Sequence, residues 1–258
     1  MAASDPPEPH DRTTPFLTAD WRWLVIANFE VDPALLAARI PAGTVLDPFE
    51  GRTLVSVVGF LFLDTRVLGV PVPGHRDFEE VNLRFYVRSR DAAGGWRRSV
   101  AFVKELVPRP AIATLARLCY QEPYQAVPMH HRVEAGPSPE APLASIAYEW
   151  KLGGRWHSIG ARVSGAPALP APGSEAEFTI EHYWGTTALR NGGAREYRVQ
   201  HPPWRVWPAE AWSIDMDVRA VYGAEWGPAL DRPPTLVLVA EGSPVSVFPG
   251  RMLGPAAA

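Results

Sequence analysis

The sequence predicts an α+β fold that is mostly antiparallel β, barrel-like in architecture and completed by a few short helices. Three observations support this class: about ten short segments have the composition or alternation of strands, two have helical spacing, and no internal repeat of fixed period is present. Hydrophobic residues make up 47% of the 258 residues, which is enough apolar surface for a globular core.

The first part of the chain predicts a tail, two strands and a helix. Residues 1–15 contain four prolines and no apolar period, so we expect a flexible tail followed by one domain over residues 16–258. Residues 21–31 form an apolar strand that ends at an Asp-Pro pair, and the next segment, residues 33–40, has helical spacing and begins on a proline suited to a first turn. Residues 53–63 predict a buried strand, because bulk and β-branching outweigh a single glycine.

A hairpin with polar residues is the most informative part of the sequence. In residues 78–88, apolar side chains alternate with asparagine, arginine and tyrosine, which is the period of a strand with two unlike faces. In a second strand-like run, residues 97–107, the apolar stretch 100–107 carries one charge on each face. Pro110 then opens a segment with the spacing of a short amphipathic helix.

The rest of the chain predicts further strands joined by turns and one long loop. Residues 144–151 and 155–163 indicate a hairpin around a Gly-Gly pair, and the proline-rich residues 165–173 indicate a connector inside the domain. Ser174 and Glu177 have capping-box spacing, although the residues that follow fit a strand equally well. The remaining strand-like segments are residues 196–199, 213–221, 235–240 and 244–248.

Composition and missing motifs argue against several function classes. A formal net charge of −3 without a cluster of arginines argues against a nucleic-acid partner. The apolar runs are shorter than the about 20 residues of a membrane helix, and the acidic, proline-rich start does not resemble a signal peptide. One cysteine suits the cytoplasm and offers no paired-cysteine zinc site. We therefore expect a cytoplasmic protein with a small-molecule ligand, no membrane partner, no metal and no cofactor; homo-oligomer formation is left open.

Lysine is scarce, since the 25 basic residues comprise 23 arginines and two lysines. Lys104 lies on an apolar strand face, where desolvation would lower its pKa and free the amine for a Schiff base; a lysine that snorkels to a carboxylate is the structural alternative. The register of the hairpin decides between two arrangements. One parity places Lys104 on the face of Arg84, and the other places Glu105 there as an ion-pair partner of the arginine.

The polar face of this hairpin is the predicted site. Lys104, Glu105 and Arg84 are the candidate catalytic residues, because they supply an amine, a carboxyl group and a bidentate cation for a carboxylate. The candidate substrate-binding residues, which would hold oxygens or form an aromatic wall, are Asn82, Tyr86, Tyr120, Glu122, Tyr124, His182 and Trp184.

Four segments resemble, in order and spacing, the YqjF-like bacterial family of unknown function: EEVNLRFYVR, VAFVKELVPRPAIATLARLCYQEPYQAVPM, EHYWG and QHPPWRVW. The resemblance implies a fold related to acetoacetate decarboxylase, a barrel or cone around a small-molecule cavity. It also matches Lys104-Glu105 to an Arg-Glu of that enzyme and places Ala111 and Ile112 near the positions of its paired lysines. We expect a protein that binds or transforms a small carbonyl or carboxylate compound without those lysines; the alternative is non-catalytic binding of a small apolar or aromatic ligand.

Overall fold

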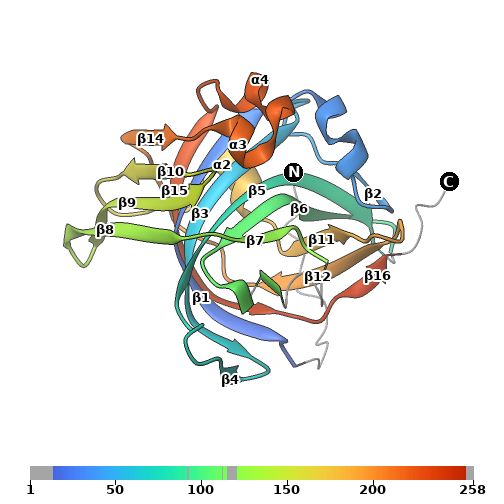
Figure 1. Ribbon diagram of the computed structural model, residues 1–258, viewed down its shortest axis with the longest axis horizontal. Helices are drawn as coiled ribbons and strands as arrows, with labels where there is room; N and C mark the ends of the chain where they lie inside the picture. Colours follow the sequence, from blue (N-terminus) through green and yellow to red (C-terminus); the bar gives the residue numbers. More distant parts are fainter. Residues whose placement is uncertain (1–13, 92, 112, 115–120, 254–258) are drawn as a thin grey trace.

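The computed structural model describes residues 14–253 except 92, 112 and 115–120 (Figure 1). Its larger sheet has twelve strands. These are β1 (Leu17–Glu30), β2 (Thr44–Leu46), β3 (Leu54–Val67), β4 (Val70–Pro71), β5 (Phe78–Arg90), β6 (Trp96–Val107), β7 (Tyr124–Ala126), β11 (Trp184–Ala188), β12 (Ala194–Gln200), β13 (Val206–Pro208), β15 (Leu236–Val247) and β16 (Arg251–Leu253).

The large sheet closes on itself. Its strands pair in the order β13-β15-β1-β3-β5-β6-β11-β12-β16, and β12 also pairs with β15. The pairings are antiparallel except for those of β6 with β7 and with β11. This ring is compatible with a barrel- or cone-like shape, and the predicted mostly antiparallel α+β class is confirmed.

A smaller antiparallel sheet packs on the outside of this ring. It consists of β8 (Met129–Ser138), β9 (Ala141–Leu152), β10 (Arg155–Arg162) and β14 (Ala211–Asp215), in the order β14-β10-β9-β8. Gly59 of β3 allows the two sheets to approach, because a Cβ atom there would lie 2.6 Å from the ring of Tyr148. The one glycine of the predicted 53–63 strand is therefore a packing requirement between sheets.

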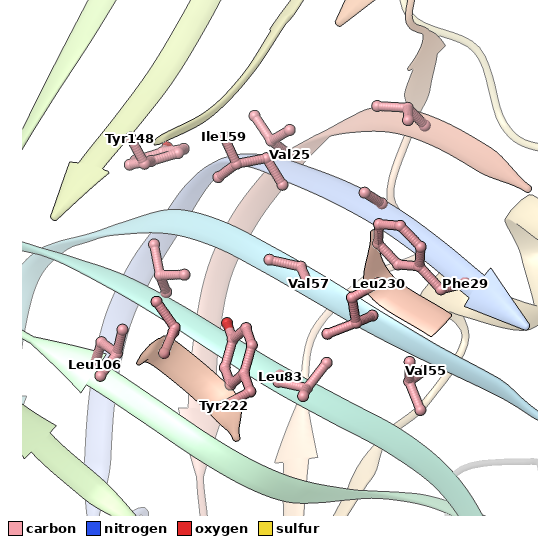
Figure 2. Packing of buried hydrophobic residues seen from close by; sticks show 14 of the residues in the cluster. Val25, Phe29, Val55, Val57, Leu83, Leu106, Tyr148, Ile159, Tyr222 and Leu230 are labelled. Atoms are coloured by element: carbon pink, nitrogen blue, oxygen red, sulfur yellow. The ribbon is translucent and has the colours of Figure 1, made fainter. Parts of the chain in front are cut away.

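The main hydrophobic core lies between the two sheets and under the helices α3 (Val218–Tyr222) and α4 (Gly227–Leu230). Figure 2 shows this packing, with Leu83 of β5, Leu106 of β6 and Tyr222 of α3 among the buried side chains. Because side chains alternate along a strand, the odd-numbered residues of β5 enter this core. The even-numbered residues of the predicted polar face therefore point to the inside of the ring.

Short helices cover parts of the sheets. The 33–40 segment forms the 3-10 helix η1 (Pro33–Arg39), and a second one is η2 (Ala224–Trp226). Ser174 caps α2 (Glu175–Ile180), where its hydroxyl accepts from the Glu177 amide at 3.2 Å, so the helix start that the capping-box spacing indicates is confirmed. The Glu177 carboxylate accepts from the Gly173 amide at 2.6 Å, one residue before the amide that a full capping box uses. Helical backbone begins at Pro110 as predicted, and most of that predicted helix lies outside the described residues.

Three of the predicted strands need correction. The strand predicted over residues 213–221 is wrong in its second half, because Asp217 caps α3 by accepting from the Ala220 amide. The two strands predicted over 235–240 and 244–248 are the single strand β15. The hairpins β5–β6 and β9–β10 are confirmed.

Candidate functional site

A cavity of about 230 Å³ lies inside the ring. Side chains of β1, β3, β5, β6, β11 and β12 line it, together with residues that precede β7 and follow α2. Most of its wall is apolar, with the rings of Trp21, Phe60, Phe62, Phe78 and Trp204 in contact along one side. Polar groups are concentrated on β5 and on the strands beside it.

A bulge in the β5–β6 hairpin decides which residue of β6 faces the cavity. Asn82 pairs with Glu105, but after a register shift Arg84 pairs with Phe102. Paired residues share a face, so both Glu105 and Phe102 point inward although three positions separate them. The sequence left two parities open, and the structure places Glu105 with Asn82 on the cavity face.

Lys104 points away from the cavity. It pairs with Leu83 on the core side, and its Nζ donates to the Val221 carbonyl oxygen at 2.7 Å, at the end of α3. Burial lowers the pKa of this lysine. Within the described residues, neither Lys104 nor Lys151 lines the cavity, so the expected catalytic amine is not placed in it.

We expect Lys104→Met to cost stability and to leave the cavity intact. Methionine keeps the apolar stem but leaves the Val221 carbonyl without its charged donor, which should lower the free energy of unfolding by about 1–2 kcal/mol. Urea unfolding measures this change, and Lys151→Met at an exposed position serves as the matched control with a change below about 0.5 kcal/mol. Lost binding of a cavity ligand in Lys104→Met with unchanged stability would contradict the structural role.

Three buried glutamates form a cluster in the cavity, which we call the carboxyl cluster: Glu80, Glu105 and Glu122. Their exposed fractions are 2%, 1% and 8%. Tyr124 and Asn82 donate to the two carboxyl oxygens of Glu80, each at 3.0 Å. Hydrogen bonds to a carboxylate favour its charged form, so these two donors favour ionisation of Glu80 and oppose the effect of its burial.

Glu122 and Glu105 differ in their hydrogen bonding. Glu122 accepts from the hydroxyls of Tyr197 at 2.6 Å and Thr187 at 3.3 Å. Gly185 of β11 makes room for this arrangement, because a Cβ atom there would lie 2.3 Å from the Tyr197 ring. By contrast, Oε2 of Glu105 is buried without a hydrogen-bond partner in the described part of the chain.

Burial raises the pKa values of all three carboxyl groups. It raises the pKa of Glu80 to about 7 in spite of the two donors. For Glu105, burial and then the nearby charges of Glu122 and Glu80 raise the pKa well above its usual range. Burial also raises the pKa of Glu122. At neutral pH the cluster therefore holds protons, and Glu105 is its most strongly protonated member.

Beyond the carboxyl cluster along β5, the cavity is lined by a guanidinium group and an imidazole ring, those of Arg84 and His182. Arg84 lines the cavity and donates to the Thr179 carbonyl oxygen at 3.0 Å, and its Nε is buried without a partner among the described residues. The ion pair expected between Arg84 and Glu105 is thus replaced by a contact with α2. Both ring nitrogens of His182 are also unpartnered there, and burial with the charges of Arg98 and Arg84 lowers the pKa of His182 well below its usual range.

The remaining predicted residues fall into three groups. Trp184 lines the cavity, with the Arg97 guanidinium 4.2 Å from its ring centroid. Tyr86 lies outside the cavity lining, in a buried network in which its hydroxyl and the Ser56 hydroxyl are 2.5 Å apart. Tyr120 lies outside the described residues. The Tyr86 ring also packs edge-on against Phe178 of α2, so Tyr86 contacts this helix and does not line the cavity.

Two residues of the site, Glu80 and Tyr197, were not among the predicted site residues. Glu80 is the residue two before Asn82 on the same strand face, so the period-two pattern already contained it. Tyr197 could not be found in this way, because its contact with Glu122 depends on strands far apart in the sequence. Ala111, matched above to a decarboxylase lysine, lines the cavity, and Ile112 lies outside the described residues.

Comparison with known proteins identifies the family. Residues 18–244 match the DUF2071 family of uncharacterized conserved proteins. The chain belongs to this family. A relative, the uncharacterized protein YqjF of Bacillus subtilis (strain 168), is 35% identical over 75 residues. That match spans 29% of this DUF2071 protein and 31% of YqjF, less than a third of either chain.

Solved structures with similar folds include acetoacetate decarboxylases. The enzyme from Legionella pneumophila subsp. pneumophila str. Philadelphia 1 is 13% identical with a TM-score of 0.63, over 98% of this chain and 94% of that one. An acetoacetate decarboxylase-like enzyme from Sphingomonas wittichii RW1 is 13% identical with a TM-score of 0.63, over 99% and 100%. The enduracididine biosynthesis enzyme MppR, complexed with pyruvate, is 14% identical with a TM-score of 0.66, over 94% and 92%. These similarities establish the fold.

The described residues contain no group of three or more His, Cys, Asp or Glu side chains arranged to hold a metal ion. The described helices also include none that is long and apolar enough to cross a membrane.

Proposed function

We propose that this DUF2071 protein binds a 2-oxo acid with an apolar substituent and transfers protons between its carbonyl oxygen and the adjacent carbon. The carboxyl cluster at one side of an apolar cavity is the observation that supports this function most directly. Neighbouring carboxyl groups whose environments separate their pKa values can act as acid and base at the same pH. Enolisation of a carbonyl compound requires both.

Glu80 and Glu105 suit opposite roles in such a reaction. Glu80, with a pKa of about 7 and two hydrogen-bond donors, is the base that takes the proton from the carbon next to the carbonyl group. The C–H electron pair becomes the C=C bond, the C=O π pair moves to oxygen, and the protonated Glu105 gives its proton to that oxygen. The product is the enol, and the reverse step returns a solvent proton to carbon without any further reactant.

Arg84 and His182 are proposed to hold the substrate carboxylate. The Arg84 Nε and one nitrogen of the neutral His182 can donate hydrogen bonds, and both are buried without partners in the described residues. A carboxylate would satisfy them and would balance the arginine charge. MppR, which shares the fold, was solved with pyruvate, and pyruvate is a 2-oxo acid.

Covalent chemistry through a lysine is not part of the proposal. Lys104 contacts α3 and Lys151 lies at the end of β9, so neither amine lies in the cavity where it could form an imine with the substrate. The carboxyl cluster can polarise a carbonyl oxygen directly, because a protonated carboxyl group is a hydrogen-bond donor.

Deuterium exchange tests the proposed function. The protein is incubated in D₂O at pH 7.5 with pyruvate, 2-oxobutanoate or 2-oxooctanoate, and the C3 proton signals are followed by NMR. We expect them to disappear at least about 100-fold faster than in buffer, as positioned acid–base groups contribute that much. Arg84→Met should raise the half-saturating concentration about tenfold or more, because a charge-assisted contact is lost. Exchange at the buffer rate with all three acids would disprove the function.

The second candidate function is non-catalytic binding of a small apolar or aromatic ligand. The observation that favours it is the continuous aromatic wall, in which Phe62 and Phe78 stack at 4.6 Å and Trp21 packs edge-on against Phe60 and Phe62. Native mass spectrometry of the purified protein tests it. A bound apolar compound together with no deuterium exchange would support this function over the first.

Several sequence-based expectations stay predictions. These are a cytoplasmic location, a single domain over residues 16–258 and the absence of a nucleic-acid partner. Formation of a homo-oligomer was left open by the sequence. Sedimentation velocity of the purified protein determines the oligomeric state.

A further inference from the structure

The cavity contains polar atoms that neither the carboxyl cluster nor Arg84 and His182 account for. Nε1 of Trp21 and Oγ1 of Thr65 are buried and have no hydrogen-bond partner in the described part of the chain. Both residues line the cavity, and Thr65 is 4% exposed. Buried donors without a partner are rare and costly, so two in one cavity wall indicate a group that the ligand supplies.

The strand register places these atoms on the side of the carboxyl cluster that is opposite to Arg84. Phe60 of β3 pairs with Glu80, and Phe62 pairs with both Phe78 and Trp21. Trp21 and Glu80 therefore lie opposite residues of β3 that are two positions apart. This offset corresponds to about 7 Å along the strands. Arg84 lies in the other direction, because it pairs with Ser56.

Thr65 extends the same end of the cavity. It follows Asp64, which has a φ of 46° where the register between β1 and β3 shifts, and its amide donates to the Arg76 carbonyl oxygen at 2.9 Å. With its amide used in this way, the hydroxyl is the free polar group of Thr65. The two side chains define what we call the distal subsite, Trp21 and Thr65.

We propose that the distal subsite binds a second, uncharged oxygen of the ligand, a carbonyl, ether or hydroxyl group. An indole N–H can only donate, and a threonine hydroxyl can donate as well, so together they select an acceptor. Neither carries a charge, which favours a neutral oxygen over a second carboxylate. The aromatic rings of Phe60 and Phe62 separate this subsite from the carboxyl cluster and suit an aliphatic segment.

This inference rests on the proposed function for the position of the first carbonyl group. If the 2-oxo group lies at the carboxyl cluster, an oxygen bound by Trp21 belongs about 7 Å further along the ligand, with Thr65, three residues beyond Phe62 on β3, on its far side. That spacing corresponds to about five carbon–carbon bonds. The substrate class is then a medium-length 2-oxo acid with a further oxygen function near its far end.

A matched pair of ligands tests the distal subsite. Calorimetry gives the dissociation constants of 2-oxooctanoate and 2,7-dioxooctanoate, which differ by one carbonyl group. We expect the wild-type protein to bind the dioxo acid about tenfold more tightly, because two unpartnered donors gain an acceptor. Thr65→Val and Trp21→Phe should each reduce this preference at least about threefold, and Thr18→Val, a residue outside the cavity lining, should not change it.

The ratio of the two dissociation constants is the readout, since a change in packing affects both ligands alike. A ratio near one in the wild-type protein, or a ratio that persists in both variants, overturns the distal subsite. A preference that both variants reduce, in a protein without deuterium exchange, supports the subsite and disproves the proposed catalysis. Deuterium exchange without a preference for the dioxo acid supports the proposed catalysis and disproves the distal subsite. If neither acid binds, both proposals fail.

Discussion

Glu105→Gln is expected to lower the rate of deuterium exchange into a bound 2-oxo acid by about 10²- to 10⁴-fold, the range that a positioned acid or base contributes. Glu105 is 1% exposed, and its Oε2 has no hydrogen-bond partner in the described part of the chain. Glutamine has the same shape and can still donate a hydrogen bond to a carbonyl oxygen, but it cannot transfer a proton. The loss should therefore appear in turnover, with the half-saturating concentration unchanged within about threefold.

A neighbouring glutamate provides the matched control for this variant. Glu79 precedes the carboxyl cluster in the sequence, but it pairs with His131 on the other side of β5, at 2.6 Å. Glu79→Gln makes the same side-chain substitution on the opposite face of β5 and should leave the exchange rate unchanged. Exchange in Glu105→Gln within a few-fold of the wild-type rate would show that Glu105 is not the acid, even if the protein binds 2-oxo acids.

The fold was predictable where the sequence pattern is local. Period-two alternation identified β5 and β6, and the Gly-Gly pair identified the β9–β10 hairpin, because backbone direction and side-chain period are properties of a short segment. β2, β4, β7, β13 and β16 have two or three residues each, too few to show a period. β8 is an exposed strand at the edge of the small sheet and shows no apolar face.

The site was predictable only in part, because it depends on register and on distant pairings. The register shift between Leu83 and Arg84 changes which residues of β6 face the cavity, from Glu105 on one side of the shift to Phe102 on the other. No single register of the hairpin places both residues on the cavity face. Sequence alternation could indicate a polar face with Asn82 and Arg84, but not that Glu105 would join it. The contact of Tyr197 with Glu122 requires β11 and β12 to lie beside β6, which no local signal reports.

The carboxyl cluster also predicts how stability depends on pH. Glu80 has a pKa of about 7 in the folded protein and 4.5 as its ordinary value, so between these values the folded state keeps a proton that the unfolded state releases. Stability therefore falls as pH rises through this window, by about 3 kcal/mol for Glu80 alone. The raised pKa values of Glu105 and Glu122 act in the same direction. The lowered pKa of His182 acts oppositely, because stability is lost as pH falls below about 6.5.

Substitution separates these contributions, since the histidines are the same in each variant and in the wild-type protein. Glutamine mimics a protonated glutamate, so Glu80→Gln should gain stability over wild type by about 3 kcal/mol more at pH 8 than at pH 4.5, measured by urea unfolding. Glu79→Gln should show the opposite trend. Burial, the largest single cause, raises the pKa of Glu79, but the hydrogen bond with His131, a backbone hydrogen bond and the charges of His131 and Arg109 together outweigh it. The net pKa is lowered, so this carboxylate stabilises the fold above its ordinary pKa. If the difference in unfolding free energy between Glu80→Gln and wild type stays constant with pH, Glu80 is already ionised at neutral pH. That result would contradict the raised pKa of Glu80, although Glu80 could still act as the base.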